Sequence, residues 1–382
     1  MKFEIGGDVF KKAVDRVMAM IPNKAAIYNL ECVRLVAEHN KVEIIGFDTE
    51  CYCNVTVPAL VMEDGEAVVH KDDLKKVYTI KNNLLVVSEQ EMFTVSNGKK
   101  KSTTKANIHY DVDDYFDMDF CKDKGNMVLK MPDSKLLEVL TRINAYTKHG
   151  LDDPNILMRA IHFDSEDRKV VGIDSHRIGL FEDINESYFA GNDITANVPN
   201  VIVAHMKKLL MKNGSYVEMY ANKKYSAFIG EDFTYCIRNY AGEFFDYKRL
   251  VNGVEFRKFY VNRKELAEVS KEYAKLAKSE KKPMFMGYNN RAFTTAIFVS
   301  DYSTSDVIET EDAEEIGDGF VIGVNPEFIN DAMNGLDSEM VTMGFKDRKS
   351  LIIVSDGEYK GYVLPVKISG MEIDNFIGYT AA

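Results

Sequence analysis

Residues 261–276, VNRKELAEVSKEYAKL, contain the end of a short apolar run, a capping residue and a helix pattern. Asn262 is one of the side chains that cap helix N-termini by accepting a backbone hydrogen bond. Apolar residues then recur at spacings of three and four, namely Leu266, Val269, Tyr273 and Leu276. This spacing puts them on one face, so the stretch predicts a strand that leads directly into an amphipathic helix.

The same pattern occurs twice more, nearer the N-terminus. Phe10, Leu136 and Leu266 occupy the same place in the three copies, at offsets of 126 and 130 residues. In the two earlier copies Asp8 and Asp133 stand where a helix cap is expected. The strand-to-helix unit is therefore predicted to be repeated three times along the chain.

A second helix pattern recurs about 65 residues into each copy. It follows Val69, Val198 and Val324, at offsets of 129 and 126 residues, and so gives the same period as the first helix. Runs rich in β-branched and aromatic residues lie between the helices, at residues 42–47, 84–87, 217–229, 292–299 and 351–354. The prediction is an α+β fold of three similar domains, 1–123, 124–253 and 254–368, each with two helices on sheets, followed by a tail, 369–382.

The charge is unevenly distributed. The chain of 382 residues has a net charge of −12, which by itself argues against a nucleic-acid partner. The first five predicted helices (8–20, 70–80, 133–148, 201–212 and 262–278) nevertheless carry +8, which leaves −20 on the rest of the chain. Two interpretations stay open: solvated helix faces, or a basic surface lined by helices that binds a polyanion through phosphate contacts.

No arrangement of catalytic residues is found. Asp174, Ser175 and His176 are adjacent in sequence and cannot converge as a triad, and phosphate loops and paired metal-binding histidines are absent from the sequence. We therefore predict no catalytic residue, metal or cofactor. One acidic run could still hold a divalent metal, although a solvated loop is favoured: Asp111, Asp113, Asp114, Asp117 and Asp119. The turn at residues 99–101, three lysines, is either a solvated hairpin tip or a contact to phosphate or a partner.

The sequence offers no sign of export or of a membrane. No apolar run approaches the ~18 residues that a membrane-spanning helix needs. The first residues alternate apolar and polar side chains and have no secretory signal, and the cysteine count, five, is odd. We expect a cytoplasmic protein with reduced thiols and no membrane contact.

Five segments, in order, carry a family resemblance. They are MKF at 1–3, DDYF at 113–116, VGIDSHRI at 171–178, GEFFDYKRL at 242–250 and YVLPVKI at 362–368. On these segments the chain resembles the beta subunit of bacterial DNA polymerase III, a sliding clamp, over residues 1–368. The resemblance implies the DNA-clamp fold: two helices on antiparallel sheets in each domain, and a head-to-tail homodimer closed into a ring around duplex DNA without reading its sequence.

The resemblance also implies a pocket between the second and third domains. This pocket would take a short peptide with apolar anchors from the polymerase III catalytic subunit, the clamp loader and other proteins with a clamp-binding motif. Its residues here would be Met158, Ile173, Ser175, His176, Arg177, Ile178, Phe245, Leu250, Val363, Leu364 and Pro365. An apolar groove suits such anchors, and His176 and Arg177 are expected to supply donors at its rim. A hairpin turn that satisfies these two side chains locally is the alternative.

Further positions are implied by the same resemblance. Lys24 and Lys148 are expected to contact DNA, and Tyr273 and Leu276 the second protomer. The family commonly ends near Ile368, and 14 more residues follow here. Two hypotheses stay open for this tail: a frayed terminus, or a segment that folds back over the peptide pocket through the sequence Ile373-Asp374-Asn375-Phe376.

The function expected from these observations is a sliding clamp that acts as a processivity factor and has no catalytic site. Two other classes stay open. One is an interaction scaffold or oligomer unrelated to DNA. The other is a metal-dependent hydrolase that uses the acidic run at 111–119.

Overall fold

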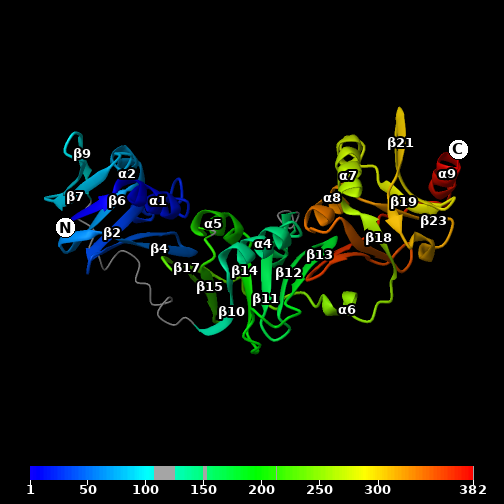
Figure 1. The fold of residues 1–382 in the computed structure, drawn as a ribbon, viewed down its shortest axis with the longest axis horizontal. Helices are drawn as coiled ribbons and strands as arrows, with labels where there is room; N and C mark the ends of the chain where they lie inside the picture. The colour runs from blue at the N-terminus through cyan, green and yellow to red at the C-terminus, as the bar shows by residue number, and fades with distance from the viewer. Residues whose placement is uncertain (107–124, 149–152, 212, 382) are drawn as a thin grey trace. The chain divides into compact units, whose positions relative to one another are not determined.

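The computed structural model describes residues 1–106, 125–148, 153–211 and 213–381. The chain divides into two compact units. Unit 1 is Met1–Glu138, Asp164–Glu166 and Tyr188–Ala241, and unit 2 is Val139–Phe163, Asp167–Ser187 and Gly242–Ala382 (Figure 1). The second predicted domain is thus divided between the units, and the three-domain division itself stays a prediction.

Unit 1 contains two antiparallel sheets. Its strands are β1 (Lys2–Gly6), β2 (Cys32–Glu38), β3 (Lys41–Phe47), β4 (Cys51–Pro58), β5 (Leu60–Glu63), β6 (Gly65–His70), β7 (Asn83–Glu89), β8 (Met92–Ser96), β9 (Lys101–Lys105), β10 (Asn126–Pro132), β14 (Thr195–Pro199), β15 (Tyr216–Ala221), β16 (Tyr225–Ile229) and β17 (Phe233–Arg238). One sheet has the order β5-β1-β7-β8-β9 and the other β10-β15-β16-β17-β4-β3-β2-β6, and β14 belongs to neither of them. Its helices are α1 (Gly7–Met18), α2 (Lys71–Val77), α5 (Ile202–Leu209) and the first half of α4 (Asp133–Asn144).

Unit 2 is built in the same way. Its strands are β11 (Ala160–Asp164), β12 (Lys169–Asp174), β13 (Arg177–Glu182), β18 (Arg257–Asn262), β19 (Met284–Asn289), β20 (Ala292–Val299), β21 (Tyr302–Val307), β22 (Thr310–Glu311), β23 (Phe320–Val324), β24 (Met340–Phe345), β25 (Ile352–Asp356) and β26 (Tyr359–Val363). They form the four-stranded order β21-β20-β19-β23 and all but the first strand of the nine-stranded order β14-β11-β12-β13-β26-β25-β24-β18-β22. Its helices are α6 (Lys248–Val251), α7 (Arg263–Ala277), α8 (Pro326–Asn334), α9 (Gly370–Thr380) and the second half of α4.

All six predicted helices are present, and the capping residues explain where several begin. The Asn262 side chain accepts a hydrogen bond from the backbone N–H of Glu265 at 3.2 Å, which starts α7, and Asn325 caps α8 in the same way. At α1 the predicted cap is wrong: Gly6 occupies the cap position, and Asp8 lies in the first turn. An acidic residue there still favours the helix because it faces the positive end of the helix dipole.

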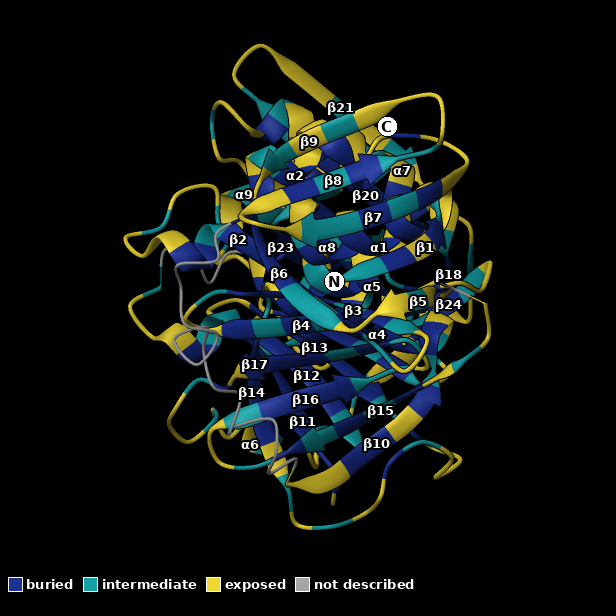
Figure 2. Ribbon diagram, turned by 90° about the vertical axis from the view of Figure 1, so that its left-hand side faces the viewer, coloured by how far each residue is buried: buried dark blue, intermediate teal, exposed yellow. Residues whose placement is uncertain are grey.

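The strand predictions hold for four of the five runs. The exception is 217–229, where a single run is expected and the hairpin of β15 and β16 is found. Asn222 explains the turn: its side-chain oxygen accepts hydrogen bonds from the backbone N–H groups of Lys224 and Tyr225, at 2.8 and 2.9 Å. Strands such as β11 and β13 are buried on both faces, whereas β9 and β21 are largely exposed (Figure 2).

Two glycines let α4 approach the sheet of unit 2. A Cβ added to Gly179 on β13 or to Gly361 on β26 would lie 2.1 or 2.2 Å from Tyr146, just after the helix, so only glycine fits there. Tyr146 is 5% exposed, and this close contact fixes α4 over the point where β13 and β26 pair.

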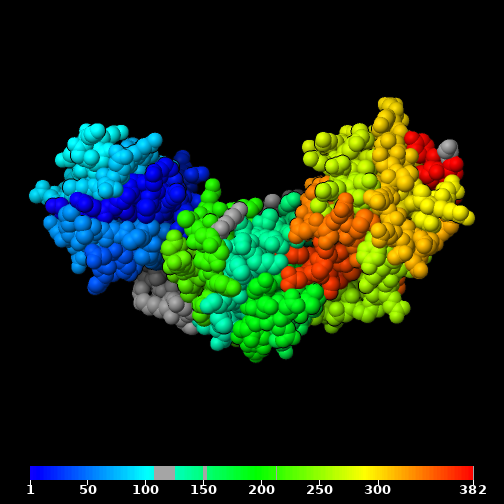
Figure 3. All heavy atoms as spheres, in the orientation of Figure 1, coloured from blue at the N-terminus to red at the C-terminus, as the bar shows by residue number. Residues whose placement is uncertain are grey.

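The tail after Ile368 is a docked helix, so the frayed terminus is wrong. Ser369 and Glu372 form a capping box at the start of α9. Phe376 is 0% exposed and packs with Phe285 and Val321 of the four-stranded sheet. In Figures 1 and 3 α9 lies beside β21, to which Tyr379 donates a hydrogen bond at the carbonyl of Ser303, at 3.0 Å.

The structure bears on two sequence predictions, the reduced cysteines and the absence of a membrane-spanning helix. Cys32, Cys51 and Cys53 are free and buried, but Cys236 is disulfide-bonded, so the expectation of reduced thiols is wrong for that residue. Among the described helices, none is both long enough and apolar enough to cross a membrane.

Candidate functional site

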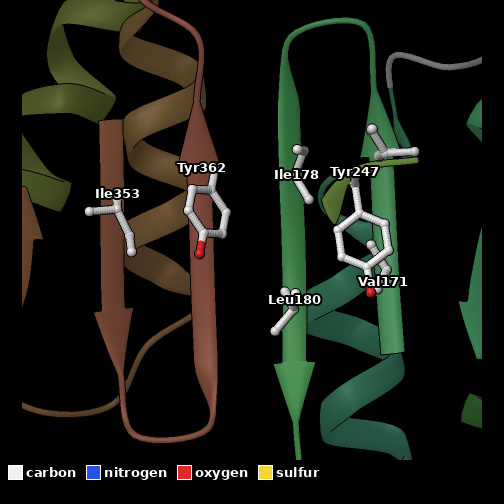
Figure 4. Packing of buried hydrophobic residues seen from close by; sticks show 7 residues of the cluster. Val171, Ile178, Leu180, Tyr247, Ile353 and Tyr362 are labelled. Carbon is white, nitrogen blue, oxygen red and sulfur yellow. The ribbon is translucent and has the colours of Figure 1, made fainter. Parts of the chain in front are cut away.

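An apolar cluster in unit 2 contains part of the predicted peptide pocket. It lies on one face of the hairpins β12–β13 and β25–β26, whose side chains Figure 4 shows on the same side. Its buried members are Val171, Ile173, Ile178, Leu180, Tyr247, Ile353 and Tyr362, with Met158, Phe244, Val251, Phe256 and Leu351 packed against them. Three of the predicted residues, Met158, Ile173 and Ile178, therefore lie in this cluster.

Three segments distant in sequence meet at the cluster. The β12–β13 turn is joined to the end of β26 by a hydrogen bond of 2.8 Å from the N–H of Leu364 to the carbonyl of His176. The loop before and through α6 crosses beside them and inserts Tyr247. The predicted residues Phe245, Leu250 and Leu364 are 43%, 44% and 41% exposed, so these segments present apolar side chains to solvent. Pro365 is half-buried next to Leu364.

Arg177 does not lie at the rim, and the expectation that it supplies donors there is wrong. Strand side chains alternate between faces, so Arg177 points away from the cluster that holds Ile178. It is 1% exposed. Its guanidinium donates to both Asp174 and Asp331 at 2.9 Å and to the carbonyl of Ala145 at 2.9 Å, and it lies 4.3 Å from the ring of Phe328.

Val363 lies on the same face of the sheet as Arg177, opposite to the apolar cluster. It pairs with Arg177 across the two strands, is 0% exposed, and neighbours Tyr362, whose side chain is in the cluster. It therefore supports the sheet from the helix side and cannot contact a ligand at the cluster without a rearrangement.

The two polar residues of the turn differ in what they bind. Ser175 is exposed and its hydroxyl donates to Asp153 at 2.7 Å, which holds the pKa of that carboxyl below its ordinary value. His176 is exposed and its ring stacks on Phe328 at 5.7 Å between centroids. His176 thus remains available at the rim, whereas the Ser175 hydroxyl is already bound.

Sequence reasoning missed the two tyrosines of the cluster. Tyr247 and Tyr362 both lie within segments that carried the resemblance, GEFFDYKRL and YVLPVKI, so their positions could have indicated them. Burial raises the pKa of Tyr362 to about 12. Asp331, which binds Arg177, is 154 residues away in sequence and gave no local signal.

The predicted DNA-contacting lysines are both on the surface. Lys24 is exposed in the loop after α1, in unit 1. Lys148 is exposed just after α4, in unit 2, and its ammonium lies 3.2 Å from Asp331, so its charge is partly neutralised. The two positions stay predictions.

The predicted protomer contacts differ from each other in burial. Tyr273 is 0% exposed, and its hydroxyl donates to Asp306 of β21 at 2.6 Å, so it holds that strand from the protein interior. It does not itself present a surface to a second protomer. Leu276 is half-buried on the same helix.

The other predicted sites are limited by what the structure describes. The acidic run at 111–119 lies outside the described residues. Within the described ranges, no group of three or more His, Cys, Asp or Glu side chains is arranged to hold a metal ion.

The tail does not cover the cluster. Ile373 and Phe376 pack against the sheet of β19, β20 and β23, among residues separate from the pocket residues at 158, 173 and 178. The hypothesis that this segment folds back over the pocket is therefore wrong.

Comparisons with known proteins point to one family. Residues 1–108 match the family model described as the N-terminal domain of the DNA polymerase III beta subunit. The "Beta sliding clamp" of Treponema pallidum is 22% identical over 361 residues, which cover 91% of this chain and 93% of that protein.

Solved structures agree with this over nearly the whole chain. The beta subunit from the DNA polymerase of Streptococcus pyogenes has a TM-score of 0.85 at 16% identity, and covers 96% of this chain and 100% of its own. A putative DNA polymerase III beta subunit from Eubacterium rectale has a TM-score of 0.83 at 20% identity, with the same coverage. The predicted clamp fold is confirmed by these likenesses, and both the family model and the curated relative are DNA polymerase III beta-subunit clamps to which this chain is similar.

Proposed function

We propose that this chain is a DNA sliding clamp: two copies join head to tail into a ring around duplex DNA, and the ring tethers polymerase and other proteins. It acts as a processivity factor and not as an enzyme, in keeping with its similarity to beta sliding clamps. The observation that carries the proposal is the way the repeated strands pair, because it leaves one complementary pair of sheet edges for a second copy.

Two joints within the chain follow one rule. At the first, β17 pairs antiparallel with β4, with Phe233 opposite Val55. At the second, β26 pairs antiparallel with β13, with Tyr359 opposite Phe181. Adding 126 to each number of the first pairing gives the second. Equivalent strands of successive repeats are therefore joined in one fixed register.

The remaining counterparts are β9 and β21. β9 follows β8 as β17 follows β16, and β21 follows β20 as β13 follows β12. Both are edge strands of their sheets in the described part of the chain. An exposed edge invites another strand, so the β9 edge of one copy suits the β21 edge of the next. Such a head-to-tail contact closes a ring when the rotation it imposes closes.

Charge complementarity supports this pairing. The turn before β9 is Asn97-Gly98-Lys99-Lys100, and the strand itself begins and ends with lysine. The β21 side carries Asp301 and Asp306. Opposite potentials of this kind steer association and fix its direction.

The excess positive charge of five helices, within an acidic chain, supports the proposed DNA contact. A modest basic lining holds a polyanion through phosphates without reading its sequence, and the contact weakens with salt. Lys24 and Lys148 belong to this proposal. The apolar cluster with its exposed Phe245, Leu250 and Leu364 is proposed to take the partner peptides. We place the protein with the replication machinery in the cytoplasm. No described residue favours a scaffold unrelated to DNA or a metal-dependent hydrolase.

Topological retention tests the proposal. Loaded by the clamp loader of its own organism on nicked circular DNA, the protein should stay bound through gel filtration in 0.2 M salt. It should be lost when the circle is cut once, because a closed ring leaves only at a free end. Equal retention on circular and linear DNA would contradict a clamp, and so would loss from both.

The pocket is tested by a double substitution at its exposed edge. Leu364→Ala with Pro365→Ala removes apolar surface at the end of β26, so the Kd for a clamp-binding peptide should rise about 10-fold or more. Fluorescence anisotropy measures it. Val307→Ala, at an equally apolar and 69% exposed position on β21, is the control and should leave the Kd unchanged. Equal Kd values for the double variant and the control would place the peptide elsewhere.

A further inference from the structure

Each of the two joints within the chain contains an arginine on the first helix of a repeat. In α1, Arg16 donates to both carboxylate oxygens of Asp232, at 2.5 and 2.8 Å, and to the carbonyl of Leu209 at 2.7 Å. Its guanidinium lies 5.8 Å from the ring of Phe233, the first residue of β17. The arginine is 7% exposed. The joint of β17 with β4 is thus held by a cation on the first helix of one repeat and an anion on the next repeat.

The second joint repeats this arrangement. Arg142 in α4 lies 126 positions after Arg16, and it donates to Asp337 at 2.5 Å. Its guanidinium lies 4.2 Å from the ring of Tyr359, the first residue of β26 and the counterpart of Phe233. The acid comes from a different loop, but its sign and the aromatic platform are the same.

In the third copy of the repeat, the position equivalent to Arg16 and Arg142 carries the opposite charge. With Phe10, Leu136 and Leu266 in register, the position of the two arginines falls on Glu272 in α7. Glu272 is exposed, and it takes part in none of the ion pairs found among the described residues. The helix that would face a second protomer therefore presents an anion where the two internal helices present a cation.

In the first repeat, residues 1–123, lysines stand at the two places where the later repeats have the acids. Asp232 stands immediately before β17, and the residue immediately before β9 is Lys100. Asp337 lies in the loop between α8 and β24, and the loop between α2 and β7 carries Lys81.

The two lysines belong to one corner of unit 1. The side-chain amide of Asn97, in the turn before β9, donates to the carbonyl of Lys81 at 3.0 Å. Both lysine side chains are exposed.

We propose that the joint between protomers uses this inverted ion pair: Glu272 of one copy binds Lys100 and Lys81 of the other. The proposal rests on the head-to-tail ring proposed above. It assigns a role to the lysine turn at 99–101 that the peptide pocket and the DNA contact leave unused.

Inversion makes the joints mutually exclusive. If α1 or α4 docked at the corner formed by Lys81 and Lys100, its arginine would meet lysines. If α7 docked at an internal joint, Glu272 would meet Asp232 or Asp337. Like charges at either place oppose the wrong pairing, so each end of the chain accepts only its own counterpart. Glu272, Lys81 and Lys100 are exposed, whereas Arg16 is buried, so salt should weaken the pair between protomers more than the internal pair of Arg16.

The test is a charge exchange read by dimer affinity. Glu272→Arg alone and Lys100→Glu alone should each raise the dimer dissociation constant about 10-fold or more, measured by sedimentation velocity in 0.1 M salt. The double variant, Glu272→Arg with Lys100→Glu, should return to within about threefold of the unmodified protein because the pair is restored with its sign reversed.

Matched controls separate the pair from net charge. Glu268→Arg is one helical turn earlier and also exposed, and Lys223→Glu lies in another hairpin turn of unit 1. Both should leave the dimer constant within threefold. Far-UV circular dichroism, unchanged in all variants, verifies folding.

Each outcome is decisive. If the unmodified protein dimerises but the single variants match their controls, or the double variant is additive, the inverted pair is overturned and the ring stands. If the unmodified protein is monomeric at every concentration, the ring proposal itself fails.

Discussion

Arg177→Ala should lower the free energy of unfolding by about 3–5 kcal/mol, a large share of what holds a protein folded. The arginine side chain is 0% exposed, and its partner Asp174 is 1% exposed. Removing the guanidinium leaves the Asp174 carboxylate buried without its cation, and Asp331 loses the same partner. The penalty comes from that stranded charge, more than from the lost attraction.

A second arginine provides a matched control. Arg249 forms an ion pair with Asp246 at the same sequence spacing of three, at 2.6 Å, which is shorter than the 2.9 Å of Arg177 with Asp174. Its side chain is 85% exposed, so water screens the pair. Arg249→Ala should therefore give no measurable change.

Urea unfolding followed by circular dichroism measures both variants. Equal stability of the two alanine variants would refute the view that burial sets the value of this pair. Peptide affinity adds a second readout, since Arg177 lies behind the cluster and not at its surface. A peptide that still binds the folded Arg177→Ala protein would agree with this position.

Phe376→Ala should release the tail helix. An isolated helix of 11 residues is marginal in water, so α9 depends on docking. Phe376 is its one fully buried side chain, and truncation of such a residue costs about 3–5 kcal/mol. We expect the amide protection of residues 370–380 to fall about 100-fold or more in hydrogen exchange.

Met371 is the control on the same helix. It is 75% exposed, and Met371→Ala should leave the exchange rates unchanged. If Phe376→Ala also leaves them unchanged, the helix is held by its capping box and backbone contacts, and the docking argument is wrong.

The fold could be predicted because its signals are local. Helical spacing with a cap found six helices, and the agreement of two landmarks on one period found the repeat. The period could not show that strands of adjacent repeats join into one sheet, because the partners of β4 and β13 lie about 180 residues farther along the chain. It also could not divide the second repeat between two compact units.

The candidate site was predictable in part for the same reason. The resemblance indicated the segments, and the cluster brings together Met158, Ile173 and Ile178. Strand alternation alone would have warned that Arg177 and Ile178 face opposite ways. The acid that holds Arg177 could not be foreseen, because Asp331 belongs to a distant helix. The docking of the tail depended on Phe376 finding its sheet, which no local pattern encodes.

The sheets that continue from one repeat into the next have a consequence for any single repeat made alone. A fragment of residues 124–253 would carry β17 with no β4 beside it and β13 with no β26 beside it. These two unpaired strand edges are complementary, because β13 is the counterpart of β4, the partner of β17. Fragments would therefore attach end to end. Such a series ends only where the rotation at each joint brings the last fragment back to the first, so the product would be a ring of several fragments or, without closure, an open filament. The intact chain avoids this because its two outer borders differ from its inner ones.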